Sequence, residues 1–440
     1  MQKLQINRQF KKIKYNFITF ESETYTWLKS LKTKKMADIT SKIREFVLKN
    51  LDEKPFGGFK DPFWQSLRHT GTELWLDTGD MEEAEANWTA EMSALTTNNT
   101  LLNNEIQKGI YDNFIGEARN IVKDLPADEQ VKEIAFILNA RHGLRLAKRF
   151  GGFVSVELHT ATAYDLKAID YYGKRYHEIC PDQFIVKVPY TAEGLLGARR
   201  LKDAGIRINF TLEFSARENV IVTRVARPDY LNVFLGRVGA YMINNKLGDG
   251  SGAGEKAVIA SQKWVTELSA KNPWRTRLIA ASLRSHNQLE LLAGTDVFTM
   301  PPKVAASGHA TLSGKFTSMI HENYEVNQFE SAKGSAIEKF WEVDDKVLHL
   351  AERLATQVPS TGTELIHIAE EEGCKDMFPI LTTEEKSFIA SDGKIPVHSR
   401  WEQKIHNGEI APDTLLTLAG LASFTADQEM LDQRIRNIIG

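Results

Sequence analysis

The sequence predicts an α/β protein, a (β/α)8 barrel followed by a helical extension, and three observations support this fold class. Between Thr72 and Ala306, short strand-like runs alternate with stretches of helical periodicity, which is typical of βαβ crossovers and a parallel sheet. There are eight such runs, and a closed TIM barrel has eight βα units in about 250 residues. After Pro301-Pro302 the pattern becomes helical.

The eight expected strands are short apolar runs bounded by polar or turn-forming residues. They are Thr72–Leu76, Ser93–Leu95, Phe153–Val156, Phe184–Val188, Arg207–Phe214, Leu231–Leu235, Arg277–Ser282 and Val297–Met300. Helices are expected between most of them, for instance at Asn103–Val122, Asp128–Phe150, Glu193–Ala204 and Ala257–Ala270. An open, doubly wound sheet would carry a Gly-rich phosphate fingerprint in an early turn, and the sequence has none.

The chain divides into three regions. Residues 1–35 carry nine Lys or Arg against two acidic residues, and we interpret them as a basic arm or as a start codon assigned too early, with the working chain beginning at Met36. Residues 36–306 form the expected barrel. Residues 307–440 form a helical C-terminal extension whose last helix is expected at Ala426–Ile439, and no chemistry is evident in it.

Composition excludes several function classes. The net charge is −3, which gives no support for binding nucleic acid or a membrane surface through overall charge. The two cysteines, Cys180 and Cys374, are too few for a disulfide framework or a thiolate metal site and suit a cytoplasmic protein. No apolar run is long enough to span a membrane. The Gly-rich stretch Gly248–Lys256 lacks the spacing of either phosphate-binding motif, and we interpret it as a flexible loop between the sixth strand and the next helix.

Lys187 lies in the run Phe184–Tyr190, which reads as a strand buried on both faces. Desolvation lowers the pKa of a buried lysine, and a neutral amine can condense with a carbonyl to form a Schiff base. The alternative is that Lys187 extends to solvent or pairs with a carboxylate. The sequence of this strand alone does not decide whether Lys187 is a nucleophile.

Polar residues near the ends of the other strands favour the nucleophile, because catalytic groups of such barrels gather at the carboxyl ends of the strands. With Lys187 itself and the apolar Phe234 included, the residues at the strand ends are, in strand order, Asp77; Thr96 and Asn98; Glu157; Lys187; Asn209 and Thr211; Asn232, Phe234 and Arg237; and Ser282 and Arg284. Together they offer an amine for a ketone, carboxylates for proton transfer, amides for hydroxyl groups and guanidinium groups for a phosphate.

The same residues lie in ordered motifs that resemble the transaldolase family of Schiff-base enzymes. These motifs are Leu76–Asp80, Ala94–Leu101, Val154–Glu157, Phe184–Pro189, Ile208–Ser215, Phe234–Arg237 and Ala281–Arg284, followed by Leu292–Asp296. The resemblance implies transfer of a dihydroxyacetone unit between sugar phosphates, with no cofactor and no metal. It leaves the oligomeric state open, a homo-oligomer included.

By resemblance, Lys187 forms the Schiff base, Asp77 is the base at the C4 hydroxyl, and Glu157 works through a water held by Thr211. Asn98 and Asn209 bind the dihydroxyacetone hydroxyls. The phosphate would be bound by Arg237, Ser282 and Arg284, while Thr96, Asn232 and Phe234 complete the substrate site.

The chain departs from the family at three places: Asn99 replaces the usual Pro, Asn232 replaces the usual Ser, and the C-terminal region is longer. The fructose-6-phosphate aldolases of the same family lack the glutamate and have a tyrosine at the position of Phe234, so Glu157 and Phe234 favour transfer over release. The alternative from outside the enzymes is a barrel that binds sugar phosphates without catalysing a reaction. A metal site at His159 would need more ligands than the sequence offers nearby.

Overall fold

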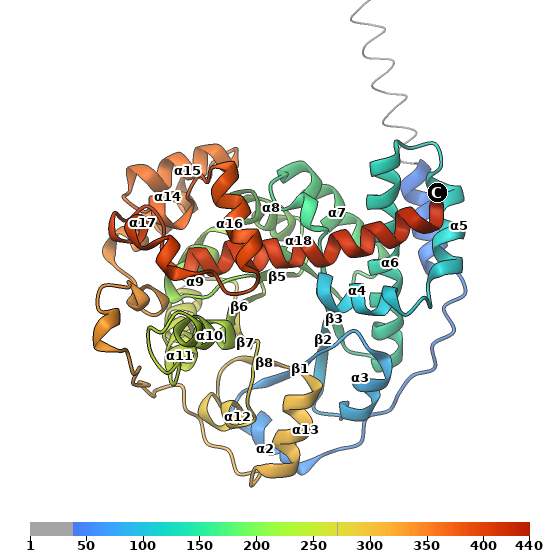
Figure 1. Cartoon of the computed structure of the whole chain (residues 1–440). Coiled ribbons are helices and arrows are strands. Elements are labelled where there is room, and N and C mark those ends of the chain that lie inside the picture. The colour runs from blue at the N-terminus through green and yellow to red at the C-terminus, as the bar shows by residue number, and fades with distance from the viewer. Residues whose placement is uncertain (1–37, 271) are drawn as a thin grey trace, which may run out of the picture.

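The computed structural model describes residues 38–270 and 272–440, and its centre is a closed barrel of eight parallel strands in chain order, β1 to β8 (Figure 1). The strands are β1 (Glu73–Asp77), β2 (Met92–Thr96), β3 (Phe153–Glu157), β4 (Phe184–Pro189), β5 (Ile208–Thr211), β6 (Tyr230–Phe234), β7 (Arg277–Ala281) and β8 (Val297–Met300). The barrel closes where β1 pairs with β8, with Glu73 opposite Val297. The predicted fold class is therefore confirmed. The basic arm at residues 1–35 lies outside the described residues.

The predicted strands are all present, and the largest difference is at the fifth. β5 ends at Thr211, because Leu212 adopts a left-handed backbone conformation with φ of 73° that breaks the extended chain. The prediction had continued this strand to Phe214.

Helices surround the barrel. They are a helix over residues 38–48, α2 (Pro62–His69), α3 (Met81–Asn87), α4 (Asn99–Gln107), α5 (Asp112–Val122), α6 (Ala127–Phe150), α7 (Leu166–Ile179), α8 (Ala192–Asp203), α9 (Ala216–Val225), α10 (Leu235–Asn244), α11 (Ala253–Ala270), α12 (Asn287–Leu291) and α13 (Pro302–Thr311). The helix expected at Asn103–Val122 is two helices, because the chain turns at Gly109, which has a φ of 79°. The Gly-rich stretch joins α10 to α11, since α10 follows β6 directly; it is not a strand-to-helix loop.

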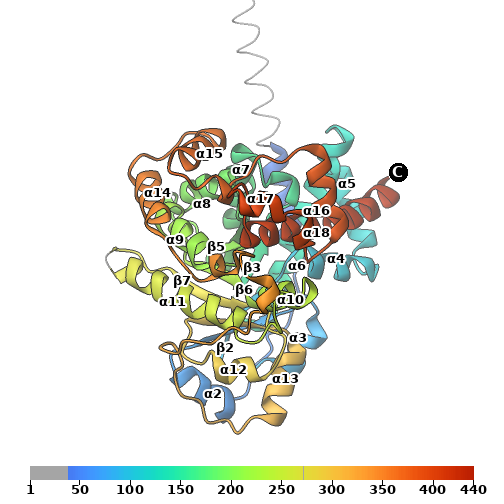
Figure 2. The ribbon, with the colours of Figure 1, turned by 60° about the vertical axis from the view of Figure 1, so that its left-hand side comes forward.

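The C-terminal region adds α14 (Asp345–Thr356), α15 (Gly362–Glu371), α16 (Thr383–Asp392), α17 (Glu402–His406) and α18 (Pro412–Ile439). Between α13 and α14 only two short 3-10 turns, Glu330–Ala332 and Ile337–Phe340, interrupt irregular chain, so this part was wrongly expected to be helical. Figure 2 shows α14 and α15 beside α8 and α9, and these helices are in contact.

The last helix, α18, is longer than predicted and runs across the face of the barrel in Figure 1. It begins at Pro412, a residue that suits the first turn of a helix. Its N-terminal half is buried on more than one side: Leu415 packs in a cluster with α16 and α17, Leu416 joins the main core, and Leu421 packs towards β5. A helix buried on several sides lacks a clear polar face, which explains why periodicity missed its first half.

Strand register places the predicted polar residues in one layer. Glu157 is paired with Lys187, and Lys187 with Asn209, on the adjacent strands β3, β4 and β5. On the other side of the barrel Asp77 is paired with Thr96. Below this layer the interior is filled by apolar side chains, namely Trp75, Ala94, Ile185, Tyr230, Ile279, Ala281 and Val297. The barrel is thus a packed core with a polar upper layer.

Candidate active site

Lys187 occupies the middle of the polar layer and is almost completely buried, with 2% of its side chain exposed. Its Nζ lies 3.4 Å from Glu157 Oε2, and Glu157 is equally buried. Nζ also donates a hydrogen bond of 3.3 Å to the carbonyl oxygen of Thr97. Of the alternative stated above, extension to solvent is therefore wrong, whereas pairing with a carboxylate is what the structure shows. The head group of Lys187 is held among β2, β3 and β4.

Two carboxyl groups share this site. Burial raises the pKa of Glu157, and the nearby Lys187 ammonium opposes that rise. Burial likewise raises the pKa of Asp77, with Lys187 and Arg284 acting in the opposite direction. Both acids therefore hold protons more readily than in water, and a raised carboxyl pKa suits a group that must both give and take a proton.

A histidine of α6 forms a hydrogen bond with the turn that follows Asp77. His142 Nε2 lies 2.8 Å from the Gly79 carbonyl oxygen, which can only accept, so this nitrogen carries the proton. His142 Nδ1 then accepts from the Tyr111 hydroxyl at 2.9 Å. Burial lowers the pKa of His142 to about 4, so the ring stays neutral. The sequence search had not singled out this histidine, which lies outside every strand motif.

The two amides on β5 and β6 form a connected set. Asn232 Nδ2 donates to Asn209 Oδ1 at 2.8 Å, and Asn209 Nδ2 donates to Ser155 Oγ at 2.9 Å. Thr211 is fully buried, and its Oγ1 has no hydrogen-bond partner among the described residues. Glu157 Oε2 accepts no hydrogen bond from the described residues either, and its one close contact is the ion pair with Lys187. These two oxygens remain available to hold a water or a substrate hydroxyl.

Thr96, the last residue of β2, and Asn98, two residues beyond it, have different hydrogen-bond partners. Thr96 Oγ1 accepts a hydrogen bond of 3.0 Å from Thr299 Oγ1 of β8. Thr299 is a polar interior residue that sequence reasoning missed, although it lies inside the eighth strand run. Asn98 caps α4, since its Oδ1 accepts from Leu101 N at 2.9 Å. Its amide nitrogen is the part that could serve a ligand.

Three predicted anion-binding residues meet at the ends of β6 and β7. Arg237 is buried, and its Nη1 has no partner among the described residues. Burial, together with the neighbouring Arg284, lowers the pKa of Arg237 to about 10. A Cβ on Gly236 would stand 2.2 Å from the Ser282 carbonyl oxygen and 2.6 Å from Arg284 Cγ, so only glycine lets these loops approach. A buried guanidinium for which the described part of the chain provides no direct ion pair fits an anionic ligand such as a phosphate.

α18 covers the corner formed by Arg237, Ser282 and Arg284. The Arg237 guanidinium lies 5.7 Å from the ring centres of both Phe234 and Phe424. A Cβ on Gly420 would come within 3.2 Å of Arg237 Nη1. The C-terminal extension therefore contributes directly to the mouth of the barrel, contrary to the expectation that no chemistry lies there.

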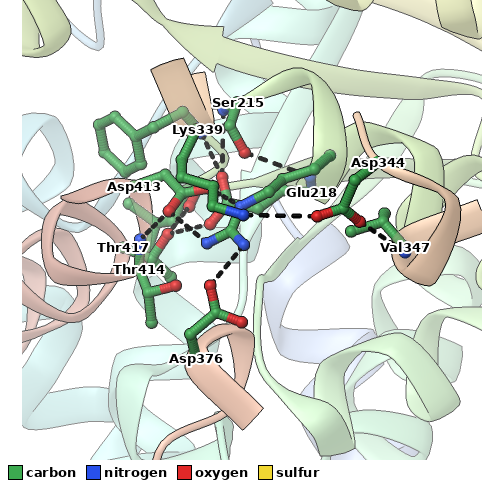
Figure 3. A network of polar contacts seen from close by, with 12 residues as sticks. Ser215, Glu218, Lys339, Asp344, Val347, Asp376, Asp413, Thr414 and Thr417 are labelled. Carbon is green, nitrogen blue, oxygen red and sulfur yellow. Dashed lines mark hydrogen bonds and ion pairs between the residues drawn. The ribbon is translucent and has the colours of Figure 1, made fainter. Parts of the chain in front are cut away.

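A buried polar network anchors the start of α18 to the start of α9 and to the loop after β5 (Figure 3). Arg217 donates to both oxygens of Asp413, at 2.6 and 2.7 Å, and to Asp376 at 2.6 Å. Thr417 Oγ1 lies 2.9 Å from the Leu212 carbonyl oxygen and 2.8 Å from Glu218 Oε1. The start of α18 is thus tied to the residue that follows Thr211.

The contacts of Thr417 indicate that Glu218 is protonated. A hydroxyl has one proton, and Thr417 must use it for the Leu212 carbonyl, which has none to give. The contact with Glu218 is then a hydrogen bond only if Glu218 donates. In agreement, burial, with a further contribution from Asp413, raises the pKa of Glu218 to about 8.

His159, considered above as a metal ligand, is paired with Asp432 of α18, with 3.1 Å between Nε2 and Oδ2. Within residues 38–270 and 272–440, no group of three or more His, Cys, Asp or Glu side chains could hold a metal ion. In the same part of the chain, no helix is long and apolar enough to cross a membrane.

Comparison with known proteins places these residues in a family context. A family model described as transaldolase/fructose-6-phosphate aldolase matches residues 74–363, about two thirds of the chain. A probable transaldolase of Thermus thermophilus is 33% identical over 237 residues, which cover 53% of this chain and 88% of that protein. The transaldolase of Rattus norvegicus is 25% identical over 303 residues, 66% of this chain and 86% of the relative. The family match ends before α18.

Proposed function

This chain belongs to the transaldolase/fructose-6-phosphate aldolase family, and on that premise we propose that it is a transaldolase. It transfers a dihydroxyacetone unit from sedoheptulose 7-phosphate or fructose 6-phosphate to erythrose 4-phosphate or glyceraldehyde 3-phosphate, as in the non-oxidative pentose phosphate pathway. The observation that carries the proposal is the buried Lys187 beside Glu157, with Asp77 in the same polar layer. We also propose that the enzyme works in the cytoplasm.

The first half of the reaction forms and uses a Schiff base. Lys187 Nζ attacks the C2 carbonyl of the ketose, and the carbinolamine loses water to give an iminium, with Glu157 moving the protons through a water held by Thr211. Asp77 takes the proton of the C4 hydroxyl as the C3–C4 bond breaks. The electron pair of that bond passes into the iminium, an aldose phosphate leaves, and an enamine remains on Lys187.

In the second half, the enamine carbon attacks the aldehyde of the acceptor, Asp77 returns the proton, and water releases the new ketose from Lys187. Asn98 and Asn209 bind the hydroxyls of the three-carbon unit throughout. Arg237, with Ser282 and the exposed Arg284, binds the phosphate group of the donor and then that of the acceptor. This assignment is supported by the unpartnered Nη1 of Arg237.

The alternative is an aldolase that releases dihydroxyacetone. Glu157 and Phe234 argue against it, because the aldolases that the sequence resembles lack the glutamate and have a tyrosine where Phe234 lies. The phenyl ring of Phe234 packs against Phe214 and has no hydroxyl to protonate the enamine.

The test is turnover of fructose 6-phosphate with and without erythrose 4-phosphate, together with borohydride reduction and mass spectrometry. We expect turnover only with the acceptor, and a reduced adduct on Lys187 that is absent in Lys187→Ala. Dihydroxyacetone release without an acceptor would establish the aldolase instead, and an adduct that persists in Lys187→Ala would refute the Schiff-base assignment.

A further inference from the structure

A chain of buried hydrogen bonds links the loop after β2 to the loop after β3 by way of α18. Asn99 Nδ2 donates to Gln428 Oε1 at 2.7 Å, and Gln428 Nε2 donates to Asp432 Oδ1 at 2.9 Å. Asp432 in turn accepts from His159 Nε2 at 3.1 Å. Asn99, Gln428 and Asp432 are exposed by only 1%, 4% and 5%.

Both ends of this chain adjoin residues of the proposed reaction. Asn99 directly follows Asn98, and His159 lies two residues after Glu157. Asn99 is also the first residue of α4, the helix that Asn98 caps. Its main-chain N–H interacts with the Glu157 carboxylate and lowers the pKa of that acid. Asn99 therefore lowers the pKa of a reacting group through its backbone and contacts α18 through its side chain.

We propose that Asn99 and Gln428 are positioning residues, through which α18 holds Asn98 and Glu157 in the geometry that the reaction needs. This inference rests on the proposed function. It assigns a role to a residue at which the chain departs from its family, because the usual Pro has neither a side-chain amide nor a main-chain N–H.

The donor and acceptor roles along this chain of hydrogen bonds can be assigned in only one way. Asp432 as a carboxylate only accepts, so Gln428 turns its amide nitrogen to Asp432 and its oxygen to Asn99. A buried amide that loses its partner is destabilised because it cannot bond to water instead, so each side chain is fixed by the next. The start of α4, next to Asn98, and the loop after β3, next to Glu157, are therefore both held against α18.

The first test compares Gln428→Leu with Gln433→Leu. Gln433 lies on the same helix and makes a similar hydrogen bond of 2.9 Å, to Asn437, but it is exposed. We expect kcat/KM to fall by about tenfold in Gln428→Leu, equivalent to about 1.4 kcal/mol of lost transition-state stabilisation. Gln433→Leu should stay within about twofold of the wild type.

The second test separates the two contacts of Asn99. Asn99→Ala removes the side-chain amide, and Asn99→Pro removes the main-chain N–H as well. The proline should fold, because it occupies the first helical position and the preceding Asn98 is extended, with φ of −154° and ψ of 174°.

Both Asn99 variants should lower kcat/KM, but only Asn99→Pro should move the acidic limb of the pH profile to higher pH. The reason is that only this variant removes the donor that lowers the pKa of Glu157. The other charged or titratable groups near the Glu157 carboxylate are unchanged in both variants. They are Lys187, Asp77, Arg237 and Tyr176.

Hydrogen exchange gives a readout that does not depend on turnover. In Gln428→Leu the amides of residues 99–107 and 158–162 should exchange faster than in Gln433→Leu. Faster exchange with unchanged kcat/KM would overturn the positioning role, as would unchanged exchange and turnover. If the wild type forms no borohydride adduct, the proposed function fails, and the exchange data still decide whether Gln428 holds these loops.

Discussion

Replacing Glu218 with glutamine should leave the protein as stable as the wild type at pH 5.5 and make it more stable at pH 9. In the fold, Glu218 Oε2 accepts from Phe214 N and Ser215 N at 2.7 and 3.2 Å, while Oε1 faces Thr417. A glutamine supplies the same pattern, because its oxygen accepts the two N–H groups and its amide nitrogen donates to Thr417.

The magnitude follows from proton linkage. The pKa of Glu218 is 4.5 in the unfolded reference and about 8 in the fold, so the folded state binds the proton more tightly. This contribution is fully present below pH 4.5 and is lost as the pH rises through 8. At about 1.4 kcal/mol per pKa unit, some 3 kcal/mol of it disappears between pH 5.5 and pH 9. The glutamine variant, which cannot ionise, avoids that loss.

The assay is urea unfolding of both proteins at the two pH values, read from the midpoint and slope. Glu385→Gln is the matched control, because Glu385 has the same capping-box position in α16 but pairs with Lys404, which lowers its pKa. Its pH dependence therefore falls below pH 5, and the control should be flat over this range. A Glu218→Gln variant that is equally destabilised at both pH values would show that Glu218 is a charged acceptor and refute the protonated assignment.

Two further substitutions test how α18 is seated. Arg217→Met should destabilise the protein by about 3–5 kcal/mol in the same unfolding assay, since it leaves buried carboxylates unpaired, whereas Arg224→Met on the same helix removes only a surface pair and should lie within about 1 kcal/mol of the wild type; equal losses would contradict the anchoring role. Gly420→Ala places a methyl 2.8 Å from Leu212 Cδ2 and 3.2 Å from Arg237 Nη1, and should raise KM for sugar phosphates more than it lowers kcat in steady-state assays. An unchanged KM would place the phosphate elsewhere.

The barrel and most of its polar layer could be predicted from sequence, because both depend on local signals. Runs such as Phe184–Pro189 are apolar enough to be recognised as buried strands, and a charged residue inside such a run is conspicuous. Strand alternation then points Lys187 and Ile185 to the same side. The structure confirmed the fold, and it places Lys187 beside Glu157.

What sequence reasoning missed depends on contacts between residues far apart in the chain. Gln428 is an unremarkable glutamine until the fold brings it to Asn99, more than three hundred positions away. Glu218 reads as a helix-capping acid, and only the position of Thr417 reveals its proton. The irregular chain between α13 and α14 was missed for a related reason, since it is held by tertiary contacts such as the bridge between Gly248 and Gln328.

The path of α18 has a consequence for how this enzyme matures during synthesis. The eight strands are complete once Met300 has been made, but the helix that covers the corner around Arg237 begins only at Pro412. Because chains emerge from the ribosome N-terminus first and their segments fold in that order, a nascent barrel would carry Arg237 before α18 exists to cover it. The mouth of the barrel is therefore completed only when the newly made α18 docks.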